Sequence, residues 1–171
     1  MRTSTMPLLL AASCVLGLAA GLHVPDAEAA AQRSRYTRPS GICEAPLPVY
    51  DAHLRKAPLR VDNVGNQTVF VNCAMPSDPV GDIGEAWVEI HFASTAAASA
   101  TVNCTLVTGS ADLPVYDVRS RSIAPGSRTW FTWSGLDKQS ADGLFAFMCS
   151  LAPGVQMTKV YASEEDSAGG I

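Results

Sequence analysis

Residues 86–92 read AWVEIHF, and apolar and polar side chains alternate along this stretch without a break. One side carries the apolar residues, and the other carries Trp87, Glu89 and His91. A period of two is the pattern of a β-strand that buries one face. Residues 68–73, TVFVNC, and residues 100–107, ATVNCTLV, repeat the alternation. The sequence therefore predicts several strands with one face in a core.

The rest of the central sequence supports an all-β fold. Residues 143–151, GLFAFMCSL, are apolar on both sides and predict a central strand covered on both faces. Residues 155–162, VQMTKVYA, predict a last strand, and segments rich in Gly, Pro and Asp separate the strands. No helical period extends over more than about ten residues. We expect a single antiparallel β-sandwich of jelly-roll type, with a small barrel as the alternative.

The N-terminus has the layout of a secretory signal peptide. A positive start is followed by an apolar run at residues 8–22 and then by small residues, with cleavage expected after Ala29 or Ala31. The apolar run is shorter than the ~20 residues that a spanning helix needs. The sequence thus predicts a signal peptide at residues 1–31, no membrane span after cleavage, and a secreted or periplasmic location.

The mature chain is expected to contain one domain. Residues 32–40, QRSRYTRPS, are polar and basic and predict a flexible lead-in. Residues 41–163 form the predicted β-sandwich domain, a length that suits one compact core. Residues 164–171, EEDSAGGI, predict a disordered acidic and glycine-rich tail.

Four cysteines remain once the signal peptide with Cys14 is removed. An even number in an exported chain predicts two disulfides. Cys104 and Cys149 fall on the apolar faces of their strands, and the nearest later partner of Cys43 is Cys73. This favours the pairs Cys43–Cys73 and Cys104–Cys149, although Cys73 also faces inward and leaves other pairings open. Each bridge would contribute about 3 to 4 kcal/mol in the chain-entropy model.

Several segments resemble a group of small secreted bacterial four-cysteine β-sandwich proteins of unassigned function. The resemblance extends over residues 63–161 and depends on four motifs, which are VNCAMP, VNCTL, FMCSLAPG and KVY. In such proteins a proline often follows the early cysteine directly, whereas Ala74 and Met75 precede Pro76 here. The resemblance implies a disulfide-bonded sandwich. It implies no substrate, because the motifs mark strand ends and bridges.

Composition and motifs argue against several classes of function. The formal net charge is −4, whereas nucleic-acid-binding domains are typically basic, so no nucleic-acid partner is expected. The sequence contains no G-x-S-x-G, no H-E-x-x-H and no phosphate-binding glycine loop. His53 and His91 are interpreted as ordinary surface residues. An oxygen-rich loop with Asp78, Asp82 and Glu85 matches no calcium motif and is interpreted as solvated. The sequence predicts no catalytic residue, cofactor or metal.

Residues 128–134, RTWFTWS, concentrate aromatic side chains in one expected strand. The alternation places Phe131 and Trp133 on the core side and Trp130 on the polar side with Arg128. Trp87 also falls on a polar face. Two of the three tryptophans are therefore expected to face outward.

Three interpretations of these outward rings stay open. A tryptophan beside polar groups can stack on a sugar ring, and tryptophan and arginine are also enriched at protein-binding hot spots. Alternatively, a loop such as residues 108–118 covers the rings. The candidate ligand-binding residues are Trp87, Glu89, His91, Arg128 and Trp130. The sequence favours an exported non-catalytic binding or structural module that contacts cell-envelope carbohydrate or another exported protein. A small secreted hydrolase with a dispersed active site is the alternative.

Overall fold

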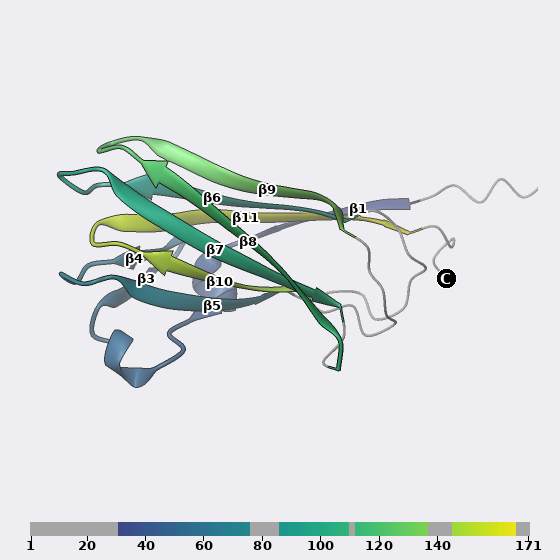
Figure 1. Cartoon of the computed structure of the whole chain (residues 1–171), viewed down its shortest axis with the longest axis horizontal. Coiled ribbons are helices and arrows are strands. Elements are labelled where there is room, and N and C mark those ends of the chain that lie inside the picture. Colours follow the sequence, from purple (N-terminus) through teal and green to yellow (C-terminus); the bar gives the residue numbers. More distant parts are fainter. Residues whose placement is uncertain (1–30, 76–85, 110–111, 137–144, 167–171) are drawn as a thin grey trace, which may run out of the picture.

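The computed structural model describes residues 31–75, 86–109, 112–136 and 145–166, which form two β-sheets (Figure 1). Sheet A has the strand order β3 (Leu54–Ala57), β4 (Arg60–Asn63), β11 (Val155–Asp166), β6 (Ala86–Ser94) and β9 (Arg128–Leu136), and β1 (Ala31–Thr37) also pairs with β11. Sheet B has the order β2 (Cys43–Glu44), β5 (Val69–Met75), β10 (Phe145–Leu151), β7 (Ala100–Gly109) and β8 (Pro114–Ile123). Two helical turns, α1 (Pro39–Ile42) and η1 (Pro48–Tyr50), precede β3.

The strands from β4 to β11 follow a jelly-roll arrangement. The order β4-β11-β6-β9 in sheet A is stacked on the order β5-β10-β7-β8 in sheet B (Figure 1). The chain passes between the sheets several times, and all strand pairs are antiparallel. This connectivity joins Greek-key strands across two layers. The predicted antiparallel β-sandwich is confirmed.

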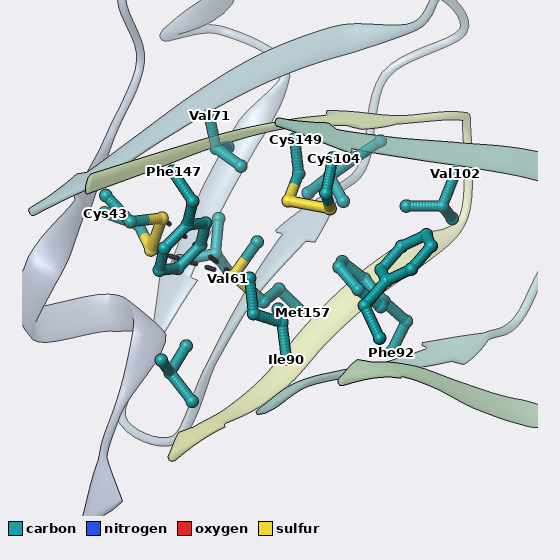
Figure 2. Close-up of a cluster of buried hydrophobic side chains, with 14 of the residues drawn as sticks. Cys43, Val61, Val71, Ile90, Phe92, Val102, Cys104, Phe147, Cys149 and Met157 are labelled. Atoms are coloured by element: carbon teal, nitrogen blue, oxygen red, sulfur yellow. Dashed lines mark hydrogen bonds between the residues drawn. A yellow bond between two sulfur atoms is a disulfide. The ribbon is translucent and has the colours of Figure 1, made fainter. Parts of the chain in front are cut away.

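The core lies between the two sheets. Figure 2 shows Ile90 and Met157 of sheet A pointing toward Phe147 of sheet B. Phe131 and Trp133 are also fully buried, as the alternation in their strand predicts. Each large apolar side chain taken out of water in this way contributes about 1.5–3 kcal/mol. The burial of alternate residues fixes the register and therefore decides which side chains face solvent.

Both disulfides lie within sheet B. Cys43 pairs with Cys73 between β2 and β5, and Cys104 pairs with Cys149 between β7 and β10. This is the pairing that the sequence favours. The four sulfur atoms point into the core, where the sulfur of Cys43 lies 3.7 Å from Met157 Sδ of sheet A (Figure 2). A bridged cysteine has no S–H, so this is a packing contact between the layers.

The structure differs from the sequence prediction at both ends of the domain. Residues 32–37 of the expected flexible lead-in belong to β1, and β11 continues through Glu164 to Asp166 where a disordered tail was expected. The physical reason is antiparallel pairing between the two segments, which places Tyr36 opposite Tyr161. Ser34 Oγ also lies 3.0 Å from the hydroxyl oxygen of Tyr161, within hydrogen-bond distance. A strand at a sheet edge needs few apolar residues, so composition alone did not reveal it.

Residues 143–151 were predicted to form a central strand that is covered on both faces. The central position is confirmed, and the cover on the outer face is not. β10 is central in sheet B, between β5 and β7. However, no described segment covers its outer face, and Met148 is 41% exposed there. Apolar residues on both sides of a strand therefore do not establish that a second layer covers both of its faces.

Three predictions lie wholly or partly outside the described residues. These are the signal peptide, apart from its last residue Ala31, the oxygen-rich loop with Asp78, Asp82 and Glu85, and residues 167–171 of the predicted tail. No helix in the described part of the chain has the length and apolar character needed to cross a membrane.

Candidate binding face

The residues selected from the sequence come together on one surface. Trp87, Glu89 and His91 lie on β6, and Arg128 and Trp130 lie on the neighbouring strand β9. All five occupy the outer face of sheet A, which is the face directed away from sheet B, because the intervening residues point into the core. His91 is directly opposite Trp130 in the register.

Trp130 and His91 form a stacked pair. Their ring centroids are 6.0 Å apart and the ring planes differ by 22°. His91 Nε2 also lies 3.1 Å from Glu89 Oε2, within hydrogen-bond distance. Trp130 keeps 48% of its surface exposed. This half of the face offers a flat apolar surface with a hydrogen-bonding carboxylate and imidazole beside it.

Three further rings form the second half of the face. Tyr161 on β11 lies beside Tyr36 of β1, with ring centroids 4.7 Å apart, and Trp87 meets Tyr161 edge-on at 5.1 Å. Tyr36 is 71% exposed and Trp87 is 37% exposed, whereas Tyr161 is buried between them. Tyr161 therefore supports two rings that solvent, or a ligand, can reach.

Lys159 connects the two halves. It is opposite His91 in the register, and its Nζ atom lies 4.7 Å from the centroid of the Tyr36 ring and 5.7 Å from that of Tyr161. Both distances are within the range of a cation–π interaction. We call this surface the aromatic face and define it by seven residues, which are Tyr36, Trp87, Glu89, His91, Trp130, Lys159 and Tyr161. His91 is four positions after Trp87 along β6, which corresponds to about 13 Å of strand.

A β-bulge explains why Lys159 and Tyr161 face outward. Met157 is opposite Phe92 and Lys159 is opposite His91, so Thr158 is an extra residue in β11. Its hydroxyl donates a hydrogen bond of 3.3 Å to the carbonyl oxygen of His91. The bulge shifts the alternation by one position, which keeps Met157 in the core and turns Lys159 toward solvent.

The sequence reasoning missed Tyr36, Lys159 and Tyr161. A signal for the last two was present, because the buried residues Met157 and Val160 are three positions apart, whereas strict alternation would space them by two. Tyr36 had no such signal. It joins the face only because β1 pairs with β11.

The proposal that a loop covers the tryptophans does not fit the described residues. The segment suggested for this role, residues 108–118, is described except at residues 110–111. Its described part belongs to β7, β8 and their junction, on the other sheet. Trp87 and Trp130 keep their exposed surface on sheet A.

The outer face of sheet B has a different character. It contains a groove of about 620 Å³ beside α1 and across β5, β10, β7 and β8. Its lining is mainly apolar and includes Ile42, Val107, Tyr116 and Met148. The polar side chains in the lining are Glu44, Asn72 and Thr105. None of the residues selected from the sequence lies in this groove.

Comparison with known proteins does not assign the chain to a family. No family model and no curated protein matches it. Among solved structures, it is similar to the C-terminal CBM6 of LamC, a marine laminarinase from Zobellia galactanivorans, with 12% identity, a TM-score of 0.41, and coverage of 76% of this chain and 98% of that one. It is also similar to the CBM1 of BiXyn10A, with 14% identity, a TM-score of 0.45, and coverage of 76% of this chain and 96% of that one. For the C-terminal family 22 carbohydrate binding module of Clostridium thermocellum Xyn10B, the identity is 14%, the TM-score is 0.40, and the coverage is 81% of this chain and 87% of that one.

Proposed function

We propose that this protein is an exported, non-catalytic module that binds carbohydrate through the aromatic face. The observation that carries the proposal is the gathering of three exposed rings with ionisable and hydroxyl groups on one sheet surface. Trp87, Trp130 and Tyr36 provide the exposed rings. Glu89 and His91 provide hydrogen-bonding groups between them.

The chemistry of sugars fits this arrangement. A pyranose ring has an apolar C–H side that can pack on an aromatic face, and its hydroxyl groups need hydrogen-bond partners in the plane of the ring. The exposed rings bury apolar area, and the polar groups beside them fix orientation. Because the face extends about 13 Å along β6, we expect it to bind an oligosaccharide and not a single sugar.

The alternatives fit the same residues less well. The centre of a protein–protein interface is depleted in charged residues, whereas Glu89 and Lys159 lie in the middle of the aromatic face. Glycoside hydrolysis commonly requires a pair of carboxylates about 5 to 9 Å apart. Glu89 is the only carboxylate among the seven residues of the face, so the proposal is a binding module and not a hydrolase.

The export part of the proposal has separate support. Two disulfides form in the structure, and such bridges persist in oxidising compartments. Together with the signal-peptide pattern, they favour a secreted or periplasmic protein related to the small four-cysteine group that the motifs resemble. Its ligand would then be a glycan of the cell envelope or of the surroundings.

Tryptophan fluorescence titration tests the carbohydrate proposal. The mature protein is titrated with a panel of oligosaccharides and cell-wall fractions, and saturable quenching or enhancement is expected with at least one of them. Trp87→Ala and Trp130→Ala should each weaken that binding about tenfold or more, as expected for an aromatic hot spot. Met148→Ala is the matched control, because it shortens an exposed apolar side chain on the other sheet.

Two results would contradict the proposal. Calorimetry that detects no binding to any member of the panel would remove its basis. Release of reducing sugars by the wild type that is lost in His91→Ala would favour the hydrolase alternative. Neither measurement uses tryptophan fluorescence as its signal.

A further inference from the structure

The described side chains on the outer face of sheet A carry an excess of positive charge in an acidic protein. The whole chain has a formal net charge of −4. On this face the described side chains include four basic residues and two acidic ones, an excess of two positive charges. The basic residues are Arg55, Arg60, Arg128 and Lys159, and the acidic ones are Asp62 and Glu89.

Both acidic side chains already have partners. Asp62 is buried on β4 and pairs with Arg55 at 2.9 Å and with Arg60 at 2.8 Å. Glu89 is engaged by His91 at 3.1 Å. By contrast, neither Lys159 nor Arg128 has an acidic side chain of the described residues within 4.0 Å. The face therefore presents two cations that lack a counter-charge within the described chain.

The positions of these two cations are specific. Lys159 is on β11 and Arg128 is on β9, and the stacked pair of His91 and Trp130 lies on β6 and β9 beside them. The tyrosine rings at 4.7 and 5.7 Å hold the Lys159 ammonium in place over the face. Two strand spacings, about 10 Å, separate β11 from β9. A sugar stacked on Trp130 thus has Arg128 two residues away on the same strand, and an oligosaccharide that extends across the sheet reaches Lys159 two strands away.

We propose that the aromatic face, together with the neighbouring Arg128, recognises an acidic glycan, whose sugar rings carry carboxylate or sulfate groups. This inference rests on the proposed carbohydrate-binding function and specifies its ligand class. The rings would take the apolar sides of the sugars, and Lys159 and Arg128 would take the anionic groups through charge-assisted hydrogen bonds. An anionic ligand would supply the counter-charge that the described residues lack. A neutral glycan would leave both cations without one.

Matched pairs of glycans test this inference. Each pair consists of an oligosaccharide of uronic acids and its carboxyl-reduced form, which has the same linkages and no charge. A sulfated oligosaccharide is measured alongside, to distinguish carboxylate from sulfate as the source of the anion. Affinities are measured by calorimetry with the wild-type mature protein. We expect the acidic member of at least one pair to bind about three- to tenfold more tightly, a range set by one or two partly exposed charge-assisted contacts.

Salt and substitution provide the diagnostic readouts. Raising the ionic strength from 0.01 to 0.15 M should weaken binding of the acidic glycan and leave binding of the reduced form unchanged, because salt screens charges at an exposed site. Lys159→Met keeps the apolar stem over the tyrosine rings and removes the charge. It should abolish most of the preference, which is the ratio of the variant's affinities for the acidic and the reduced form, and this ratio is independent of any contact that both forms lose. Lys56→Met, on the edge strand β3, is the control and should keep the preference.

The outcomes separate this inference from the function on which it rests. If a reduced oligosaccharide binds as tightly as its acidic counterpart, the inference is overturned and carbohydrate binding stands. If no member of any pair binds and Trp87→Ala changes no titration, the proposed function fails and the inference with it. A preference that survives in Lys159→Met and in Arg128→Met would also overturn the assignment of these two cations.

Discussion

The two outer faces of this sandwich differ in how they use exposed hydrophobic surface. On sheet A, the exposed rings of Trp87 and Trp130 alternate with ionisable groups, and each ring has a polar neighbour. On sheet B, Met148 and Tyr116 line an apolar groove of about 620 Å³ with few polar groups. Apolar contact is non-directional, whereas hydrogen bonds fix the orientation of a ligand. The face of sheet A is therefore the better candidate for recognition of a polar ligand such as a sugar.

The sheets also differ in how they are stabilised. Both disulfides join neighbouring strands of sheet B, and sheet A has none among the described residues. Sheet A depends on packing against sheet B and on its own pairing. The covalent bridges and the proposed binding face thus lie in different layers, so variants can test either layer or the contacts between the two.

Removal of the Cys104–Cys149 bridge should have the largest effect. The double variant Cys104→Ala/Cys149→Ala opens a loop of 45 residues, which costs about 4 kcal/mol of unfolding free energy in the chain-entropy model. The corresponding variant of Cys43 and Cys73, with a separation of 30 residues, should lose about 0.4 kcal/mol less. Urea denaturation measures both values. In the folded fraction, glycan affinity should match wild type, and a parallel loss of affinity would show that the two layers are coupled.

A glycine at a junction between the sheets should have the next largest effect. Gly154 lies in the turn from β10 to β11 with a φ of +76°, and a Cβ atom there would be 2.9 Å from the backbone nitrogen of Ala96. Gly154→Ala should therefore cost about 2 kcal/mol or more, from backbone strain and from this close approach. Gly126 has a φ of +68° with nothing within 4 Å of its would-be Cβ. Gly126→Ala should lose only about 1 kcal/mol of unfolding free energy, from backbone strain alone. If thermal unfolding shows that the two variants lose equal stability, the close approach of residue 154 to Ala96 does not contribute.

A smaller effect is expected at the edge where the sheets meet. Arg119 of β8 donates a hydrogen bond to the carbonyl oxygen of Thr132 in β9, and its guanidinium lies 5.1 Å from the centroid of the buried Trp133 ring. Arg119→Met removes both interactions and also the exposed ion pair with Asp117 at 3.2 Å, and should cost about 1–2 kcal/mol, because the side chain is partly exposed. Arg121→Met on the same strand is the control and should stay within about 0.5 kcal/mol of wild type. If urea denaturation finds the two variants equal, Arg119 does not link the layers.

The alternation of apolar and polar residues predicted most of this architecture, and the features that it did not predict can be named. The strand at residues 86–92 and the inward Phe131 and Trp133 followed from a period of two, because the core accepts only one face of each strand. The outward position of Trp130 followed in the same way. That its neighbour in space would be His91 did not follow, because the register between β6 and β9 depends on contacts distant in sequence.

Two parts of the candidate face could not be predicted by a simple period. Tyr36 lies in a segment without apolar pattern, and only the pairing of β1 with β11 brings it to Tyr161. Lys159 and Tyr161 depend on the bulge at Thr158, where one extra residue changes the alternation. A bulge is visible in a sequence as a spacing of three between buried residues, provided that the strand is already known.

Deletion of Thr158 tests this origin of the aromatic face and should have the smallest effect. Without Thr158, Met157 precedes Lys159 directly, and the two face inward and outward as they do in the bulged strand. The variant should fold with a loss of about 1 kcal/mol, from the hydrogen bond to His91, and should keep its glycan affinity. Deletion of Thr132 in the regular strand β9 is the contrasting variant, because it would turn Trp133 out of the core or Phe131 away from Ile90. Circular dichroism and fluorescence titration of both proteins suffice. If the Thr158 deletion unfolds as the Thr132 deletion should, Thr158 is not a dispensable insertion, and the outward placement of Lys159 needs another explanation.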